Sequence, residues 1–189
     1  TVYGLVVDAT NEIAVIRIFE IKGREENKSL PVFVSGVRMA KEYADISPEQ
    51  ERFLEKVWPG AVTVVLGLRT QEKRLRNFEQ KLSRFVIQNE TIGMRTPKDE
   101  FLQEVLCRIG VPLAQTSANI SGGAPARNAE EVRRFFDGRD PQPELIIDGG
   151  ECDGKPSTVL DYSGSTPNVL REGAVSREAV FQLLRDSDL

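Results

Sequence analysis

The sequence predicts an α/β fold in which helices flank a twisted, mixed sheet. Segments with helical spacing of apolar residues are interspersed with short apolar runs typical of strands. The two kinds of segment do not alternate strictly, and the later strands follow one another with only loops between them. This order favours a mixed sheet over a doubly wound parallel one. A chain of 189 residues can bury one substantial core, so we expect a single domain over residues 1–189.

Apolar spacing and capping residues define the predicted elements of the first half. A helix is predicted over residues 11–21. A later helix begins after Ser47, which can form a capping box with Gln50, and it should stop at Trp58. The predicted strands of this half are residues 31–35 and 61–68.

The second half opens with residues 70–84, which are charged and expected to face solvent. Helices should begin at Thr96, Asn128 and Ser176, the first of them ending at Gly110. Cys107 falls within the apolar pattern of that first helix and is expected in the core. The predicted strands of this half are residues 91–95, 112–116, 145–147, 157–162 and 168–171.

The composition excludes several classes of function. The chain has no histidine, which rules out a Ser-His-Asp triad, a Cys-His pair and zinc sites built on histidine. A net charge of −4 argues against non-specific coating of nucleic acid, although a local cationic cleft remains compatible with it. No apolar run approaches the length of a membrane span, and two unpaired thiols fit a reducing compartment, so we expect a cytoplasmic protein.

Two groups of side chains are candidates for binding a polyanion. Lys22, Arg24 and Lys28 place three cations at the end of the first predicted helix. Taken alone, these cations fit a solvated helix end better than a ligand site, but Arg and Lys are also the side chains that hold phosphates. Arg95 and Arg171 lie at the ends of predicted strands, where ligands of α/β folds gather. Neither a P-loop nor a G-x-G-x-x-G motif occurs.

Small polar residues follow the predicted strand 112–116. Ser117 and Asn119 are followed by Ser121 and two glycines. A polar turn that satisfies its own backbone is one interpretation. The other is a ligand site, because small residues let a ligand approach the main chain closely and an Asn side chain can both donate and accept hydrogen bonds.

These residues, in this order, resemble the motifs of the YrdC-like family, whose main members are threonylcarbamoyl-AMP synthases. The match runs in order over nearly the whole chain, and jointly the motifs are highly specific. The chain begins inside the first motif, so residues before Thr1 are expected to be missing. The matching segments are Thr1-Val2-Tyr3-Gly4-Leu5, Lys22-Gly23-Arg24, Trp58-Pro59-Gly60 with Thr63, Arg95-Thr96-Pro97, Ser117-Ala118-Asn119, Ser121-Gly122, Ser157-Thr158-Val159 and Leu170-Arg171-Glu172-Gly173.

The resemblance implies a twisted mixed sheet around a large, open, cationic cavity. It also implies a nucleotidyl transfer in which L-threonine, bicarbonate or CO₂ and ATP, accompanied by Mg²⁺, give L-threonylcarbamoyl-AMP and pyrophosphate. The threonylcarbamoyl group then reaches tRNA directly or through a transferase partner. The family also has longer members, and the short, single-domain form is predicted here.

The resemblance also assigns roles to residues, position by position. The motif residues Lys22, Arg24, Ser117 and Asn119 form the catalytic signature and should line one cavity. Phe33 falls where some members carry His, and Ala126 where some carry Ser. The ATP-binding set is Arg24, Lys28, Thr91, Ser117, Ala126 and Arg171, and the threonine-binding set is Thr1, Phe33, Arg95, Gln115 and Ser157.

Three alternatives remain open at the level of the sequence. A carbamoyl-adenylate-forming module is one, although the chain has no Cys-rich finger. An RNA- or tRNA-binding protein is the second, and the acidic net charge weakens it. The third is a paralogue that keeps the cavity and has lost the reaction, against which the intact Lys22, Arg24, Ser117 and Asn119 argue.

Overall fold

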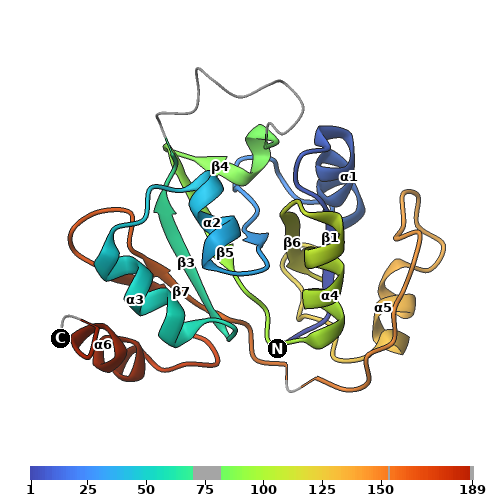
Figure 1. Ribbon diagram of the computed structural model, residues 1–189. Coiled ribbons are helices and arrows are strands. Elements are labelled where there is room, and N and C mark those ends of the chain that lie inside the picture. The colour runs from blue at the N-terminus through green and yellow to red at the C-terminus, as the bar shows by residue number, and fades with distance from the viewer. Residues whose placement is uncertain (70–81, 153, 188–189) are drawn as a thin grey trace.

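The computed structural model describes residues 1–69, 82–152 and 154–187, and in these residues helices pack against one eight-stranded mixed sheet (Figure 1). The predicted mixed α/β fold is therefore confirmed. The strands are β1 (Gly4–Asp8), β2 (Val32–Phe33), β3 (Val62–Gly67), β4 (Ile87–Gln88), β5 (Thr91–Arg95), β6 (Leu113–Ser117), β7 (Thr158–Asp161) and β8 (Asn168–Arg171). The helices are α1 (Glu12–Lys22), α2 (Val37–Tyr43), α3 (Pro48–Val57), α4 (Glu100–Ile109), α5 (Ala129–Phe136), α6 (Arg177–Arg185) and the short 3₁₀ helix η2 (Arg84–Val86).

The strand order is β1-β6-β2-β5-β3-β7-β8, with β4 paired to β5. The β2–β5 and β3–β7 pairs are parallel, and the other pairs are antiparallel. The first and last strands of the chain, β1 and β8, therefore form the two opposite edges of one sheet. None of the helices in the described ranges is long and apolar enough to cross a membrane.

The two faces of the sheet have different neighbours. The even-numbered residues of β3, β5 and β7 include Val64, Met94 and Leu160, which are fully buried in the main core. On the opposite face, Phe33 of β2 and Leu113 of β6 form a smaller cluster with Leu106 of α4. Because side chains alternate along a strand, the odd-numbered residues of β3, β5 and β7 point away from the main core.

Helix caps confirm most of the predicted helix boundaries. Asn11 caps α1, Asn128 caps α5 and Ser176 caps α6, each through its side chain. Gly23 and Gly110 end α1 and α4 in the left-handed conformation, which glycine adopts without strain.

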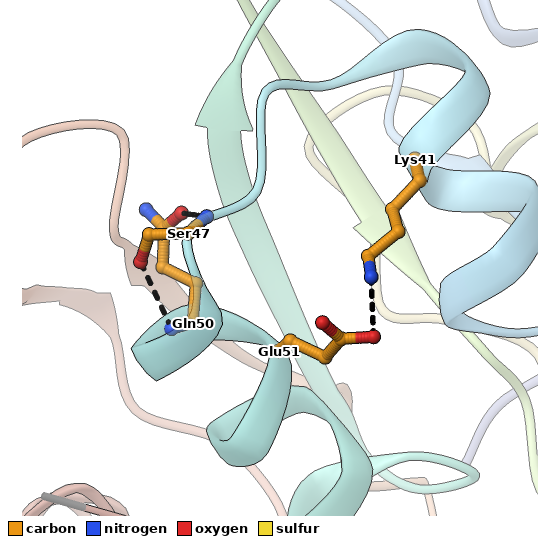
Figure 2. Close-up of polar contacts among 4 residues, drawn as sticks. All are labelled: Lys41, Ser47, Gln50 and Glu51. Atoms are coloured by element: carbon orange, nitrogen blue, oxygen red, sulfur yellow. Dashed lines mark hydrogen bonds and ion pairs between the residues drawn. The ribbon is translucent and has the colours of Figure 1, made fainter.

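The start of α3 shows the predicted capping box (Figure 2). The Ser47 hydroxyl accepts from the Gln50 backbone N–H at 3.2 Å, and the Gln50 side chain accepts from the Ser47 N–H at 2.7 Å. Lys41 of α2 forms an ion pair with Glu51 of α3. From the middle of α3, Arg52 donates to the Ser187 carbonyl at 2.8 Å, and α6 lies beside α3 in Figure 1.

Two of the predicted elements are wrong, each for a local reason. Helix α4 begins at Glu100 and not at Thr96, because Asp99 accepts from the Leu102 N–H at 2.8 Å and caps it. The proline after Thr96 disfavours helical geometry at Thr96. Residues 145–147 form no strand: Leu145 is 75% exposed, and no neighbouring strand in the described residues pairs with this segment.

The predicted burial of Cys107 is also wrong. Leu106 is fully buried, and Cys107, one residue further along α4, is exposed. Successive side chains of a helix point about 100° apart. A residue within an apolar stretch of a helix can therefore lie outside the face that packs against the core. The charged segment 70–84 lies mostly outside the described residues, and its described part includes the buried Leu82 and Ser83.

Candidate active site

An open cavity of about 1130 Å³ lies on the sheet face away from the main core. Its floor consists of odd-numbered residues of the central strands, including Thr63, Val65 and Gly93. Gly93 has no side chain to project into the cavity, and a Cβ at this position would make a tight contact of 3.3 Å with the Pro31 Cβ. The fold therefore leaves part of one sheet face, beside the small α4 cluster, open to a ligand, while the other face carries the main core.

The predicted threonine set converges on this cavity. All five of its members line it, although they come from segments far apart in the sequence. Strand pairing explains the convergence, because β2 and β5 are parallel with Phe33 beside Arg95, and β7 begins beside β3. The residues are Thr1, Phe33, Arg95, Gln115 and Ser157.

Arg95 is held rigidly at the end of β5. Its Nε donates to the Gly60 carbonyl at 2.6 Å, and Nη1 donates to the Thr1 hydroxyl at 3.2 Å. The guanidinium carbon lies 5.8 Å from the Phe33 ring centroid. Burial lowers the pKa of Arg95 to about 10, so the side chain stays protonated at neutral pH. A fixed guanidinium with donors left over is well suited to hold a carboxylate.

Thr63 is a cavity residue that sequence reasoning did not assign to the site. Its hydroxyl lies 2.9 Å from the Ser157 hydroxyl, and both side chains are buried. The sequence carried two signals: Thr63 belongs to the motif that begins at Trp58, and it is a hydroxyl residue in the middle of the predicted buried strand 61–68. The pair forms a small polar spot on an otherwise apolar part of the floor.

Four of the six predicted ATP residues also line the cavity. Arg24, Thr91, Ser117 and Arg171 do so. Lys28 and Ala126 do not. The Lys28 carbonyl accepts from Arg24 at 3.3 Å, and Ala126 is fully buried, with its carbonyl accepting from the Tyr3 N–H.

The arginines of the ATP set are partly desolvated. Burial lowers the pKa of Arg24 and that of Arg171. Arg171 donates to the Ser157 carbonyl at 2.8 Å, which links the two predicted ligand sets. The cavity is also lined by Lys98 and by the carboxylates Asp99, Asp148 and Asp161, so its predicted cationic character stays a prediction.

Lys22 and Asn119 do not line the cavity, which corrects the expectation that they would. Lys22 is only 3% exposed, and its ammonium donates to the Ser117 carbonyl, the Asn119 carbonyl and Asn119 Oδ1 at 2.5, 2.9 and 3.0 Å. The Asn119 amide donates to the carbonyls of Ile120 and Gly123. Asn119 is therefore bonded to the protein itself and does not present its amide to a ligand.

Burial, and secondarily the charge of Arg24, lowers the pKa of Lys22 to about 8. Arg24 follows Lys22 by two residues but leaves helix α1 after Gly23, which adopts φ 58°. This turn sends the two neighbouring cations in different directions. Lys22 points behind the cavity wall, and Arg24 points into the cavity.

A loop segment that includes Leu145 and Ile147 forms part of the cavity wall. The Tyr3 hydroxyl holds it, donating to Asp148 or the Gly150 carbonyl and accepting from the Gly149 N–H at 3.0 Å. Hydrogen bonds from Gly150 and Tyr3 lower the pKa of Asp148. These bonds explain how a segment without strand partners keeps its place.

Taken together, the fold and the cavity define a small-molecule-binding α/β domain with fixed arginines and hydroxyl groups on one sheet face. Residues 1–173 match a family model, Sua5_yciO_yrdC, that carries the description "Telomere recombination". The chain belongs to this family, as the motifs suggested.

Relatives and solved structures agree with this assignment. The chain is 32% identical to threonylcarbamoyl-AMP synthase of Bacillus subtilis over 95% of its own length and 49% of the relative's. Sua5 of Pyrococcus abyssi, solved in complex with L-threonine, superposes with a TM-score of 0.84 at 33% identity, covering 97% of this chain and 51% of that one. Escherichia coli YciO gives a TM-score of 0.78 at 25% identity, covering 95% and 85%. The chain spans about half the length of the first two relatives.

Proposed function

We propose that this chain forms L-threonylcarbamoyl-AMP from L-threonine, bicarbonate or CO₂, and MgATP, and releases pyrophosphate. The observation that carries the proposal is the convergence of all five predicted threonine residues on the cavity that Arg24, Ser117 and Arg171 also line. Relatives that share a third of its residues are named threonylcarbamoyl-AMP synthases, and one was solved with L-threonine.

The proposed chemistry needs alignment more than acid–base catalysis. The threonine amine combines with CO₂ to give a carbamate, one oxygen of which attacks the α-phosphorus of ATP as pyrophosphate leaves. No protein nucleophile takes part, which suits a chain without histidine. Positioning and neutralisation of phosphate charge supply the rate enhancement in such transfers.

The residues of the cavity divide into two groups in this proposal. Arg95 would hold the threonine carboxylate, with the Thr63–Ser157 hydroxyl pair nearby on the floor. Arg24 and Arg171 would hold the triphosphate, and Mg²⁺ would arrive with ATP as part of the substrate. The Arg171–Ser157 hydrogen bond joins the two groups, so the carbamate and the α-phosphate would meet where the two sets adjoin. The product would pass its threonylcarbamoyl group to tRNA, directly or through a transferase partner.

Pyrophosphate release from ATP and bicarbonate, measured with and without L-threonine, tests the proposal. We expect release that depends on threonine and on bicarbonate, and much less with L-serine or L-valine. The variant Arg24→Met serves as a control for contaminating ATPases, because it should abolish the threonine-dependent part. If release did not depend on threonine, the proposed reaction would be wrong.

A further inference from the structure

The buried ammonium of Lys22 stands out, because it carries a charge within a cavity wall without reaching the cavity. In the described part of the chain, no carboxylate forms an ion pair with it, and its partners are three neutral oxygens. A buried cation without a counter-ion is costly, so its hydrogen bonds must matter to the local structure. An ammonium has three N–H donors, and these three bonds use all of them.

All three bonds end on residues 117–123, called here the 117–123 loop, which comprise the last residue of β6 and the loop that follows it. The backbone of Lys22 holds the same loop, since its carbonyl accepts from the Ser121 N–H at 2.9 Å. Within the loop, Asn119 Oδ1 accepts from both Lys22 and the Ser117 hydroxyl, the latter at 2.5 Å. The helix end and the loop therefore form one closed hydrogen-bond network, in which Asn119 is the central member.

We propose that Lys22 is a positioning residue, which holds the 117–123 loop so that Ser117 and Arg24, and not Lys22 itself, contact the nucleotide. This proposal rests on the proposed function. The ammonium draws the carbonyl oxygens of Ser117 and Asn119 to the side of the loop away from the cavity. Carbonyl oxygens that faced the cavity would repel phosphate oxygens, so the network keeps the cavity side of the loop suitable for an anion.

The first test compares Lys22→Met with Arg24→Met in nucleotide-free protein. Hydrogen exchange of the amides of residues 117–123 should quicken by about tenfold or more in Lys22→Met, because the loop loses its anchor. Arg24→Met is the matched control, two residues away and facing the cavity, and should leave exchange of the loop unchanged. Both variants should bind ATP more weakly than the wild type.

The second test measures coupling in ATP affinity. Lys22→Met and Asn119→Ala each disrupt the same hydrogen-bond network. The ATP affinity of the double variant should therefore be no lower than that of whichever single variant binds ATP more weakly. Lys22→Met and Arg24→Met act through different contacts, and their effects should multiply. Unchanged loop exchange in Lys22→Met, together with multiplicative effects of Lys22→Met and Asn119→Ala, would overturn the proposal.

A third measurement needs no variant and covers the case in which Lys22→Met does not fold. The Lys22 ammonium resonance of the wild type, followed by NMR, should keep its chemical shift when ATP is added. A large shift on ATP binding, of the kind a direct phosphate contact produces, would show that Lys22 is a ligand. Failure of the proposed reaction is recognised separately, because the exchange experiment requires neither turnover nor threonine.

Discussion

At the scale of single residues, the site depends on where each guanidinium or ammonium finds its partners. Lys22 and Arg24 are two residues apart, yet their side chains have different partners. The Lys22 ammonium donates to buried backbone carbonyls, whereas Arg24 lines the cavity. Arg95 is intermediate, since it is anchored by Gly60 and Thr1 and still lines the cavity. The chemistry of a cation in this protein therefore follows from its acceptors and not from its place in a motif.

The carboxylate role of Arg95 gives a residue-scale prediction. Arg95→Lys keeps the charge but loses the two-pronged geometry, so the KM for threonine should rise by about 10- to 100-fold, the equivalent of a lost charged hydrogen bond. The KM for ATP should change little. Steady-state kinetics measure both, and Arg24→Lys, as control, should show the opposite pattern. Equal effects of Arg95→Lys on both substrates would contradict the division of the cavity.

The depressed pKa of Lys22 gives a second prediction, on stability. The pKa of this ammonium is about 8 in the folded protein, whereas the ordinary lysine value, which applies to the unfolded chain, is 10.5. Between these two values the unfolded chain binds more protons than the folded protein. The contribution of Lys22 to the free energy of unfolding should therefore rise as pH increases through this window.

Urea unfolding of the wild type and of Lys22→Met at about pH 7.5 and about pH 10 measures this contribution, because other titrating groups cancel in the difference. The stability of the wild type relative to the variant should be greater at the higher pH. A difference that did not change with pH would mean that the Lys22 pKa is not depressed. Arg24 is the charged group that acts on Lys22, so Arg24→Met should raise that pKa.

The sequence predicted much of the site because family motifs mark positions, but motifs do not say which way a side chain points. Lys22 and Asn119 were therefore expected in the cavity and lie behind it. Thr63 belongs to a matched motif but was given no role in the site, because its side chain gains a partner only when the fold places Ser157 beside it. Those two residues are 94 positions apart, so only the tertiary fold brings them together.

At the scale of elements, the β7–β8 region joins both halves of the site. Gly173, just after β8, is packed so closely that a Cβ would lie 2.3 Å from the Pro156 carbonyl oxygen and 2.6 Å from the Ser157 carbonyl oxygen. Its N–H donates to the Thr158 hydroxyl at 2.9 Å. The segment that follows β8 therefore has no room for a side chain at position 173.

Gly173→Ala should therefore displace Ser157 and, through their hydrogen bond, Arg171. We expect a loss of stability of about 1–3 kcal/mol, as for other overpacked sites, and a higher KM for both substrates. Thermal unfolding and kinetics measure the two effects. Gly164→Ala is the matched control between β7 and β8, because a Cβ there meets nothing within 4 Å. Similar behaviour of the two variants would show that the packing at Gly173 does not support the site.

Elements with a local signal were predicted well, and those without one were not. The capping box of α3 and the cap of α5 each involve only a few consecutive residues, so the sequence alone is enough to predict them. Helix α2 was not predicted, since Gly36 precedes it without a side-chain cap. Residues 145–147 have the composition of a strand but no partner in the described sheet, and their place depends on Tyr3, about 145 residues earlier.

At the scale of the whole molecule, the cavity spans strands from both ends of the chain, so ligands that fill it should stabilise the entire fold. ATP and threonine together, each at a hundred times its dissociation constant, should raise the unfolding free energy by several kcal/mol, since one such ligand contributes about 2.7 kcal/mol. A shift in Tm of several degrees should follow, measurable by calorimetry.

Gly93→Val is the control for that measurement, because its side chain would rise from the cavity floor next to Pro31 and Thr63. The ligand-induced shift should fall sharply in this variant. A full shift in Gly93→Val would show that the ligands bind elsewhere.

The alternation of side chains on the central strands has a consequence for how this protein can change. On β3, β5 and β7 the odd-numbered residues other than Gly67 border the cavity, whereas the even-numbered ones are buried on the core side. Selection for a new amino-acid substrate would therefore act on the cavity-facing positions, and selection for thermal stability on the core-facing positions. The two sets of positions alternate along the same strands but share no residue. A library randomised only at odd positions of these strands could explore new substrates with few unfolded members.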